Sequence, residues 1–154
     1  MPYLVVDDLK IPQSLSIARF LARRFNLAGR DELEQVKADV IVNTLGDLRN
    51  AFYDRVFFLD EGVQKEEAKS KFLDDAKLHL GRVEKLIGQY GSNGHAVGNA
   101  LTWADLETFE VTTDLLMLYP TLLDGYSGIL GVRKSVESHE KLSAYIKNRL
   151  VTPY

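Results

Sequence analysis

The sequence predicts an α+β chain that is mostly α: a β-hairpin with one helix in residues 1–25, a linker over 26–30, and an all-helical bundle over 31–154. Two observations predict it. Residues 3–11 carry the alternation of a strand, and apolar residues then recur every three or four positions, which is the period of a helix. A hairpin with one helix is below the roughly 40 residues that fold unaided, so residues 1–25 are not expected to form a domain alone.

The hairpin is predicted from its turn. Tyr-Leu-Val-Val at residues 3–6 is aromatic and β-branched, as strands prefer. Asp7 and Asp8 are turn residues, and Leu-Lys-Ile at 9–11 resumes the alternation of apolar and polar side chains. Pro12 is expected to end the second strand.

A helix is predicted directly after the hairpin, with Ser14 as its N-cap. Its apolar residues recur at helical spacing: Leu15, Ala18, Leu21, Ala22 and Phe25. Residues 26–29 end with Gly29, which is typical of a helix C-terminus, and form the best candidate for a linker between domains.

Two long helices are predicted next. The first follows Asp31, with an apolar stripe made of Leu33, Val36, Val40, Ile41, Leu45, Leu48 and Phe52. The second starts near Glu66 and Glu67, whose charges suit a helix N-terminus. Its stripe consists of Phe72, Ala76, Leu80, Val83, Leu86, Ile87 and Tyr90.

The remaining elements follow a glycine-rich loop that runs from residue 91 to residue 98. Apolar residues fall on more than one face between Thr102 and Tyr119, which predicts a central helix surrounded by its neighbours. Two shorter helices are expected over 125–137 and 140–150.

Composition excludes several classes of function. The 19 Lys and Arg and 22 Asp and Glu give a net charge of −3, which disfavours binding to nucleic acid or to an anionic membrane surface. There is no cysteine, so disulfides and thiolate catalysis are excluded. No apolar run approaches the roughly 18 residues of a membrane-spanning helix. We therefore expect a soluble, cytoplasmic protein with no nucleic-acid or membrane partner.

Few residues suggest chemistry by themselves. Thr102 and Asp105 match a capping box, a structural motif. Gln13-Ser14 opens a helix whose free N–H groups attract an anion. A serine at the start of a helix, however, more often acts as an N-cap that binds no ligand. No pair of histidines has the spacing of metal ligands, so we interpret them as surface or capping residues: His79, His95 and His139.

The order of these features resembles a cytosolic glutathione transferase. The hairpin, Gln13-Ser14, Leu-Ala-Gly at 27–29 and Thr-Trp-Ala-Asp at 102–105 follow one another as in that family. The sigma class, which includes glutathione-dependent prostaglandin D synthase and the S-crystallins, is the most similar. The resemblance implies that 1–25 is the latter half of a thioredoxin-like, glutathione-binding domain and that 31–154 is the helical domain, in a homodimer.

The same resemblance implies where glutathione binds. Pro2 matches the cis-proline of the family, and the backbone of Met1 matches the residue that pairs with the cysteinyl part of glutathione. Gln13 and Ser14 match the pair that holds the γ-glutamyl end. Asp47 matches an acid that reaches the glutamyl amine across the dimer interface.

A pocket for a small hydrophobic electrophile is implied as well. Phe52 and Val111 match positions that line it in the sigma class, with Arg49 beside them. Thr102 and Asp105 match the folding motif of the family, which is structural. No metal is expected: the acids of the prostaglandin D synthase metal site correspond to Asn43, Gly46 and Asp47, so only Asp47 is acidic here.

The catalytic tyrosine of the family lies on a first strand for which the 154 residues have no counterpart. The first expectation is therefore a glutathione transferase, conjugating electrophiles or isomerising substrates, whose sequence here is truncated before that tyrosine and whose activity alone is weak. The second expectation is a non-catalytic, S-crystallin-like protein that serves a structural role, binds glutathione or mediates dimerisation.

Overall fold

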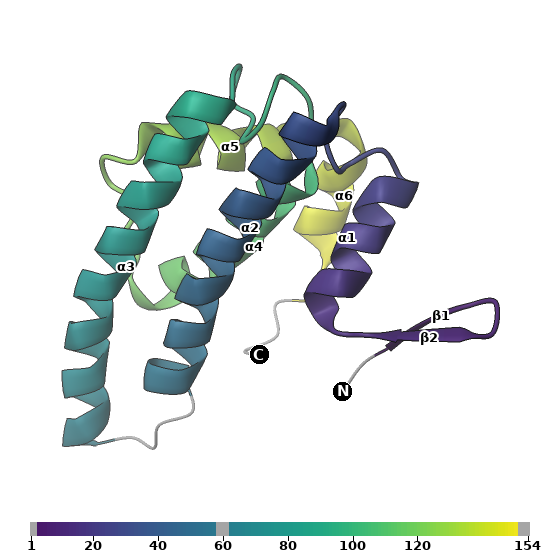
Figure 1. Ribbon diagram of the computed structural model, residues 1–154. Helices are drawn as coiled ribbons and strands as arrows, with labels where there is room; N and C mark the ends of the chain where they lie inside the picture. Colours follow the sequence, from purple (N-terminus) through teal and green to yellow (C-terminus); the bar gives the residue numbers. More distant parts are fainter. Residues whose placement is uncertain (1–2, 58–61, 151–154) are drawn as a thin grey trace.

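The computed structural model describes residues 3–57 and 62–150, and it confirms the predicted fold class. A two-stranded hairpin is followed by a set of helices (Figure 1). The elements in chain order are β1 (Tyr3–Val6), β2 (Leu9–Pro12), α1 (Ser14–Arg24), α2 (Glu32–Phe52), a π-helical turn (Tyr53–Phe57), α3 (Val63–Tyr90), α4 (Trp103–Leu118), α5 (Ser127–Ser138) and α6 (Glu140–Asn148).

The hairpin is antiparallel and projects away from the helices (Figure 1), with Tyr3 opposite Pro12 and Val6 opposite Leu9. Asp7 has a φ of 52°, in the left-handed region that a tight turn requires. Pro12 is the last residue of β2 rather than the residue beyond it, because proline is tolerated at the edge of a sheet.

Helix α1 begins at Ser14, so the prediction that Ser14 is its N-cap is wrong by one residue. Gln13 occupies the N-cap position with φ 75° and ψ 114°, and its side chain makes no capping hydrogen bond. Arg19 anchors α1 on the other helices. Its Nε lies 2.9 Å from Oδ1 of Asp39 on α2, and its guanidinium lies 5.3 Å from the centre of the Trp103 ring.

The predicted stripe of α2 divides into two faces. Its C-terminal part is buried as expected and consists of Ile41, Leu45, Leu48 and Phe52. Its N-terminal part is wrong as a core prediction, because Leu33, Val36 and Val40 are 71%, 59% and 37% exposed. An apolar face of α2 is therefore left uncovered in the single chain.

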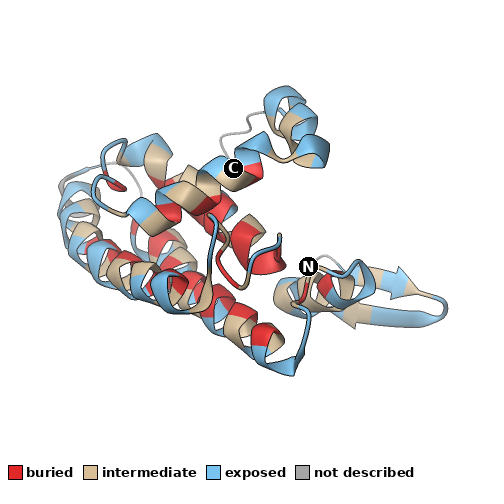
Figure 2. Ribbon diagram, turned by 90° about the horizontal axis from the view of Figure 1, so that it is seen from above, coloured by how far each residue is buried: buried red, intermediate tan, exposed pale blue. Residues whose placement is uncertain are grey.

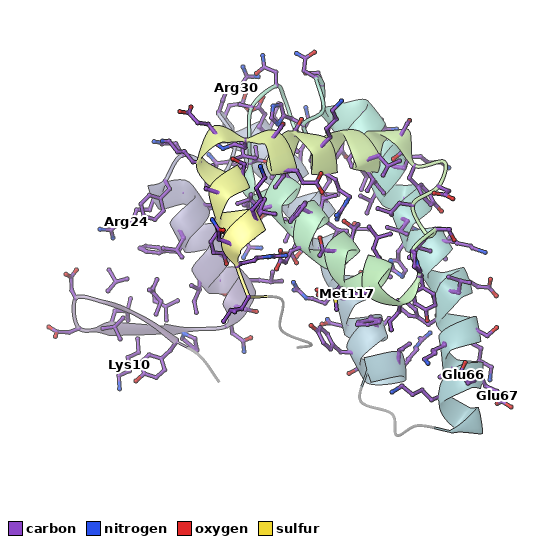
Figure 3. The ribbon with its side chains drawn as sticks, turned by 180° about the vertical axis from the view of Figure 1, so that it is seen from behind. Lys10, Arg24, Arg30, Glu66, Glu67 and Met117 are labelled. Carbon is purple, nitrogen blue, oxygen red and sulfur yellow. The ribbon has the colours of Figure 1, made fainter. Side chains whose placement is uncertain are left out.

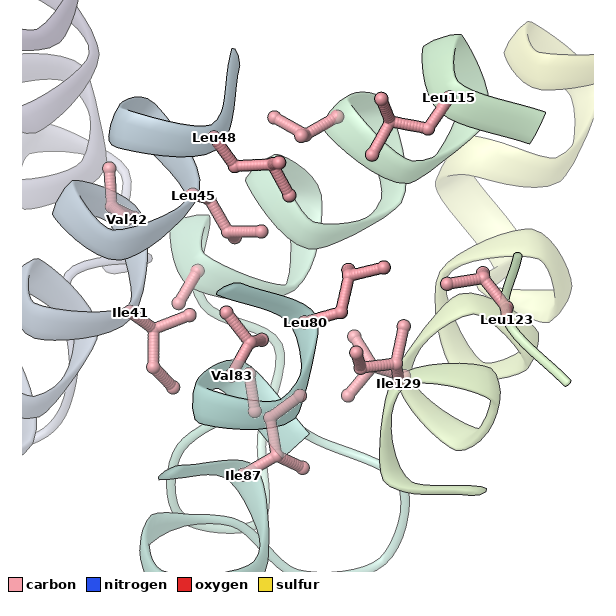
Figure 4. Packing of buried hydrophobic residues seen from close by; sticks show 14 of the residues in the cluster. Ile41, Val42, Leu45, Leu48, Leu80, Val83, Ile87, Leu115, Leu123 and Ile129 are labelled. Carbon is pink, nitrogen blue, oxygen red and sulfur yellow. The ribbon is translucent and has the colours of Figure 1, made fainter. Parts of the chain in front are cut away.

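The core lies between α2, α3, α4 and α5 (Figures 2 and 4). Helix α3 contributes the residues that its pattern predicts, among them Phe72, Ala76, Leu80 and Val83. Helix α4 is buried on several sides, which confirms the prediction of a central helix. None of the helices in the described ranges is long and apolar enough to cross a membrane.

Candidate functional site

The first candidate region is the start of α1, where Gln13 and Ser14 are both exposed. The N–H groups of the first helical turn have no partner within the helix, so they attract an anion. The positive φ of Gln13 is uncommon for a residue other than glycine, and such strain clusters at ligand sites. Met1 and Pro2, which the resemblance assigns to the same ligand, lie outside the described residues.

Asp47 lies on α2, on a different helix from Ser14, and five cavities along the described residues are lined by none of Asp47, Gln13 and Ser14. It is exposed, and its spacing from Leu33, Val36 and Val40 puts all four side chains on one face of the helix. An acid that acts across an interface between two copies would have this position.

A cavity of about 690 Å³ lies between α2, α4 and the end of α6, and we refer to it as the α2–α4–α6 cavity. It brings together Arg49 and Val111 from the predicted pocket. Phe52 is instead 1% exposed, with its ring centre 5.5 Å from that of Phe72 in the core. The other lining residues are Tyr53, Glu110, Thr113, Asp114, Met117 (labelled in Figure 3), Tyr145, Arg149 and Leu150.

Two ion pairs lie at this cavity. Arg49 pairs with Glu107, and Nη1 of Arg149 lies 2.9 Å from both carboxylate oxygens of Glu110. Burial raises the pKa of Glu107, against the opposing effect of Arg49. Burial also raises the pKa of Asp114, and the neighbouring Glu110 raises it further. The wall of the cavity is therefore polar and acidic as well as apolar.

Sequence reasoning missed the polar residues of this cavity other than Arg49, among them Tyr53, Glu107 and Asp114. Burial raises the pKa of Tyr53 above its usual range, and the nearby Asp114 acts in the same direction. One signal was present, since the acids at 107, 110 and 114 are spaced to share one face of a helix that is otherwise buried.

A second cavity, of about 420 Å³, adjoins the first between α1, α4 and α6. Its lining is mainly apolar and includes Leu21, Trp103 and Phe109. Glu110 and Arg149 line both cavities, so this ion pair stands where the two meet.

The capping box at the start of α4 is present. Oδ2 of Asp105 accepts from the backbone N–H of Thr102 and from its hydroxyl, both at 2.7 Å. Oδ1 accepts from the N–H of Ala96 at 2.8 Å, which fixes the preceding loop. The interpretation of His95 as a surface residue is wrong: its ring is 19% exposed, and Nδ1 lies 3.5 Å from Oδ1 of Asp105.

The other two histidines differ from each other. His139 is the N-cap of α6, as predicted, and its Nδ1 accepts from the N–H of Lys141. His79 is partly buried on α3. Within residues 3–57 and 62–150, no group of three or more acidic or histidine side chains is arranged to hold a metal ion.

Comparison with known proteins was made for sequence and for fold. Residues 46–149 match the family described as "Glutathione S-transferase, C-terminal domain". Hematopoietic prostaglandin D synthase of Mus musculus is 34% identical over 151 residues, which are 97% of this chain and 72% of that protein. S-crystallin SL11 of Nototodarus sloanii is 28% identical over 156 residues, covering 100% of this chain and 76% of that protein.

A solved structure supports the same relationship. The monomeric glutathione S-transferase Na-GST-3 of the hookworm Necator americanus superimposes with a TM-score of 0.88 at 29% sequence identity. The superposition covers 100% of this chain and 76% of that one. The similarity therefore includes the hairpin and α1 as well as the helical part.

Proposed function

The chain belongs to the glutathione S-transferase family, and from this premise we propose that it binds glutathione and brings it to a small hydrophobic electrophile. The reaction class is glutathione conjugation or glutathione-dependent isomerisation. One observation carries the proposal: Gln13 and Ser14, which the family resemblance assigns to glutathione, stand at an exposed helix N-terminus whose N-cap residue, Gln13, has a strained backbone.

The γ-glutamyl end of glutathione carries a carboxylate, which suits this place. The free N–H groups of the first turn of α1 would donate to it, and the helix dipole would add roughly 0.3–1 kcal/mol at an exposed site. We assign the cysteinyl part to the backbone of Met1 beside Pro2. Asp47 is proposed to reach the glutamyl amine from a second copy of the chain.

The electrophile is proposed to bind in the α2–α4–α6 cavity. Its volume of about 690 Å³ is within the range of small-molecule sites. Arg49 and Val111 line it, whereas Phe52 is proposed to support the wall from the core side. The adjoining apolar cavity offers further room for an extended hydrophobic group.

Activity requires the thiolate of glutathione, because the thiolate and not the thiol is the nucleophile. In the family a tyrosine donates a hydrogen bond to this sulfur, and the 154 residues contain no counterpart of the strand that carries it. We therefore propose that this polypeptide binds glutathione but conjugates it slowly.

A homodimer is part of the proposal. The exposed side chains of Leu33, Val36 and Val40 form an apolar face on α2, and burial of apolar surface is the main force for association. Asp47 on the same face would then lie near the partner's glutathione. The hookworm relative is monomeric, so the alternative outcome of the test is a monomer.

A second candidate function is a non-catalytic, S-crystallin-like role. The similarity to S-crystallin SL11 supports it. This protein would keep the fold and the dimer while glutathione binding is weak or lost.

Thermal unfolding with and without millimolar reduced glutathione separates the two functions. A ligand at a hundred times its dissociation constant stabilises the native state by about 2.7 kcal/mol, so binding predicts a clear rise in Tm. The variant Gln13→Ala should reduce the rise, whereas Gln35→Ala on α2 is a control outside the site. An unchanged Tm for the native chain would favour the structural role.

A further inference from the structure

The loop over residues 91–98, which joins α3 to α4, contains the one asparagine of the chain that a glycine follows, Asn93. Asn93 is exposed and has a φ of 54°, and Gly94 has a φ of 77°. The N–H of His95 donates to the carbonyl oxygen of Ser92 at 3.0 Å. Residues 92–95 therefore form a tight turn with two left-handed residues at its centre.

An asparagine before a glycine can lose its side-chain amide without an enzyme, and asparagine is among the thermolabile residues for this reason. The backbone nitrogen of Gly94 attacks Cγ of Asn93. The bond from that nitrogen to Cγ forms, the bond from Cγ to Nδ2 breaks, and ammonia leaves with the proton of the Gly94 N–H. Water then opens the resulting cyclic imide at either carbonyl, which gives an aspartate or an iso-aspartate.

The turn favours this reaction at Asn93. Gly94 has no Cβ, so its own side hinders the attack least. Its N–H has no acceptor within residues 3–57 and 62–150, so the attacking nitrogen breaks no hydrogen bond. The exposure of Asn93 admits the water that opens the imide. Asn99 is exposed as well, but Ala100 follows it, so it serves as an internal comparison.

The iso-aspartyl product would not fit this loop. Its backbone runs through the former side chain and is longer by one carbon between the neighbours of residue 93. A Cβ on Gly91 would already collide with the carbonyl oxygen of His95, so the two ends of the turn are in direct contact. A Cβ on Gly94 would lie 2.7 Å from Oγ of Ser135, so the tip of the turn is packed against α5.

The same loop is attached to the start of α4. Ala96 is fully buried, and its N–H donates to Oδ1 of Asp105 at 2.8 Å. Val97 is 1% exposed. A longer backbone a few residues before Ala96 would displace this donor from a carboxylate that is itself fully buried, which leaves both groups without their partner.

We propose that Asn93 is a site of spontaneous deamidation and that its iso-aspartyl product loosens the loop from α4 and α5. The chain thus contains a chemical limit on the lifetime of its folded state. The inference is independent of the proposed function, because it uses no residue that is assigned to glutathione or to the electrophile.

Incubation of the native chain at mildly alkaline pH, followed by peptide mapping with mass spectrometry, tests the site. We expect progressive loss of the amide at Asn93, whereas Asn99 keeps its amide. The chain in urea is the positive control, because without its fold the attack is unrestrained. An intact Asn93 in the native chain, or equal loss at Asn93 and Asn99, overturns the proposal.

Thermal unfolding tests the effect on the loop. Anion-exchange chromatography separates the acidic products from the native chain, and fragment masses identify the iso-aspartyl form. Its Tm should lie below that of the native chain and below that of Asn93→Asp, which carries the same charge on an unaltered backbone. Asn93→Gln should yield no acidic product over the same time, and Asn99→Gln should yield as much as the native chain. An iso-aspartyl form that unfolds at the Tm of Asn93→Asp contradicts the proposed loosening.

Discussion

Glu84 on α3 caps the start of α5 at Gly128: its Oε1 accepts from the N–H of Gly128 at 2.7 Å. Its Oε2 accepts from the N–H of Ile129 at 2.9 Å. The N-cap residue, Tyr126, makes no side-chain cap of its own, so α5 takes its cap from another helix. A Cβ at Gly128 would lie 3.0 Å from Oε2, and the glycine thus makes room for the contact.

Removal of this carboxylate should destabilise the whole helical part. We expect Glu84→Ala to lower the free energy of unfolding by about 1–2 kcal/mol, as for the loss of a helix cap with two bonds. Glu67→Ala on the same helix, which is exposed, should change it by less than about 0.5 kcal/mol. Urea unfolding followed by circular dichroism measures both, and equal losses would argue against the cap.

Asp105 should be the most sensitive polar residue of the core. Its side chain is fully buried and accepts from Ala96 and Thr102. Asp105→Ala leaves these donors unpaired and should cost about 3 kcal/mol or more. Thr102→Ala removes one hydroxyl and should cost only about 1 kcal/mol. The ranking is checked by urea unfolding, and a larger loss for Thr102→Ala would contradict it.

Stability should fall in acid partly because of Glu34. Hydrogen bonds from the Arg30 side chain and backbone lower the pKa of Glu34 from 4.5 to about 2. The folded state therefore favours the carboxylate, and this contribution is present above the unfolded pKa and lost as the pH falls from 4.5 towards 2. Between about pH 6 and pH 3 the urea midpoint should fall further for the native chain than for Glu34→Gln. Glu32→Gln, on the same helical turn, should behave as the native chain does.

The exposed face of α2 predicts the oligomeric state. Val36→Lys should convert a dimer into a monomer in sedimentation velocity, because a charge would replace apolar surface at the interface. Leu130→Lys, at an exposed apolar position on α5, should leave the dimer intact. A native chain that sediments as a monomer would contradict the proposed homodimer.

The helical spacing of apolar residues predicted the elements, because most of these helices bury one continuous stripe of apolar side chains. It failed where an apolar face is exposed: Leu33 and Ile41 have the same side-chain chemistry, and only tertiary packing decides that the second is buried. The N-cap of α1 was misplaced because serine is the usual cap, whereas here the backbone of Gln13 makes the turn.

Sequence reasoning proposed site residues only at positions that match the family. Gln13, Ser14, Thr102 and Asp105 lie in family motifs, and Arg49 and Val111 match single positions of the family pocket. The acids Glu107 and Asp114 belong to no family motif. Their place in the site depends on long-range contacts, such as that between Glu107 and Arg49, which are 58 positions apart in sequence. Spacing on α4 places the acids together but does not show which cavity they face.

Glutathione is proposed to bind at the start of α1. Amide chemical shifts of the isotope-labelled chain, recorded by NMR during titration with reduced glutathione, test it most directly. We predict saturable shifts that are largest for Gln13, Ser14 and the rest of the first turn of α1, and that are lost in Gln13→Ala. Shifts confined to other helices, or none at millimolar glutathione, would contradict the account.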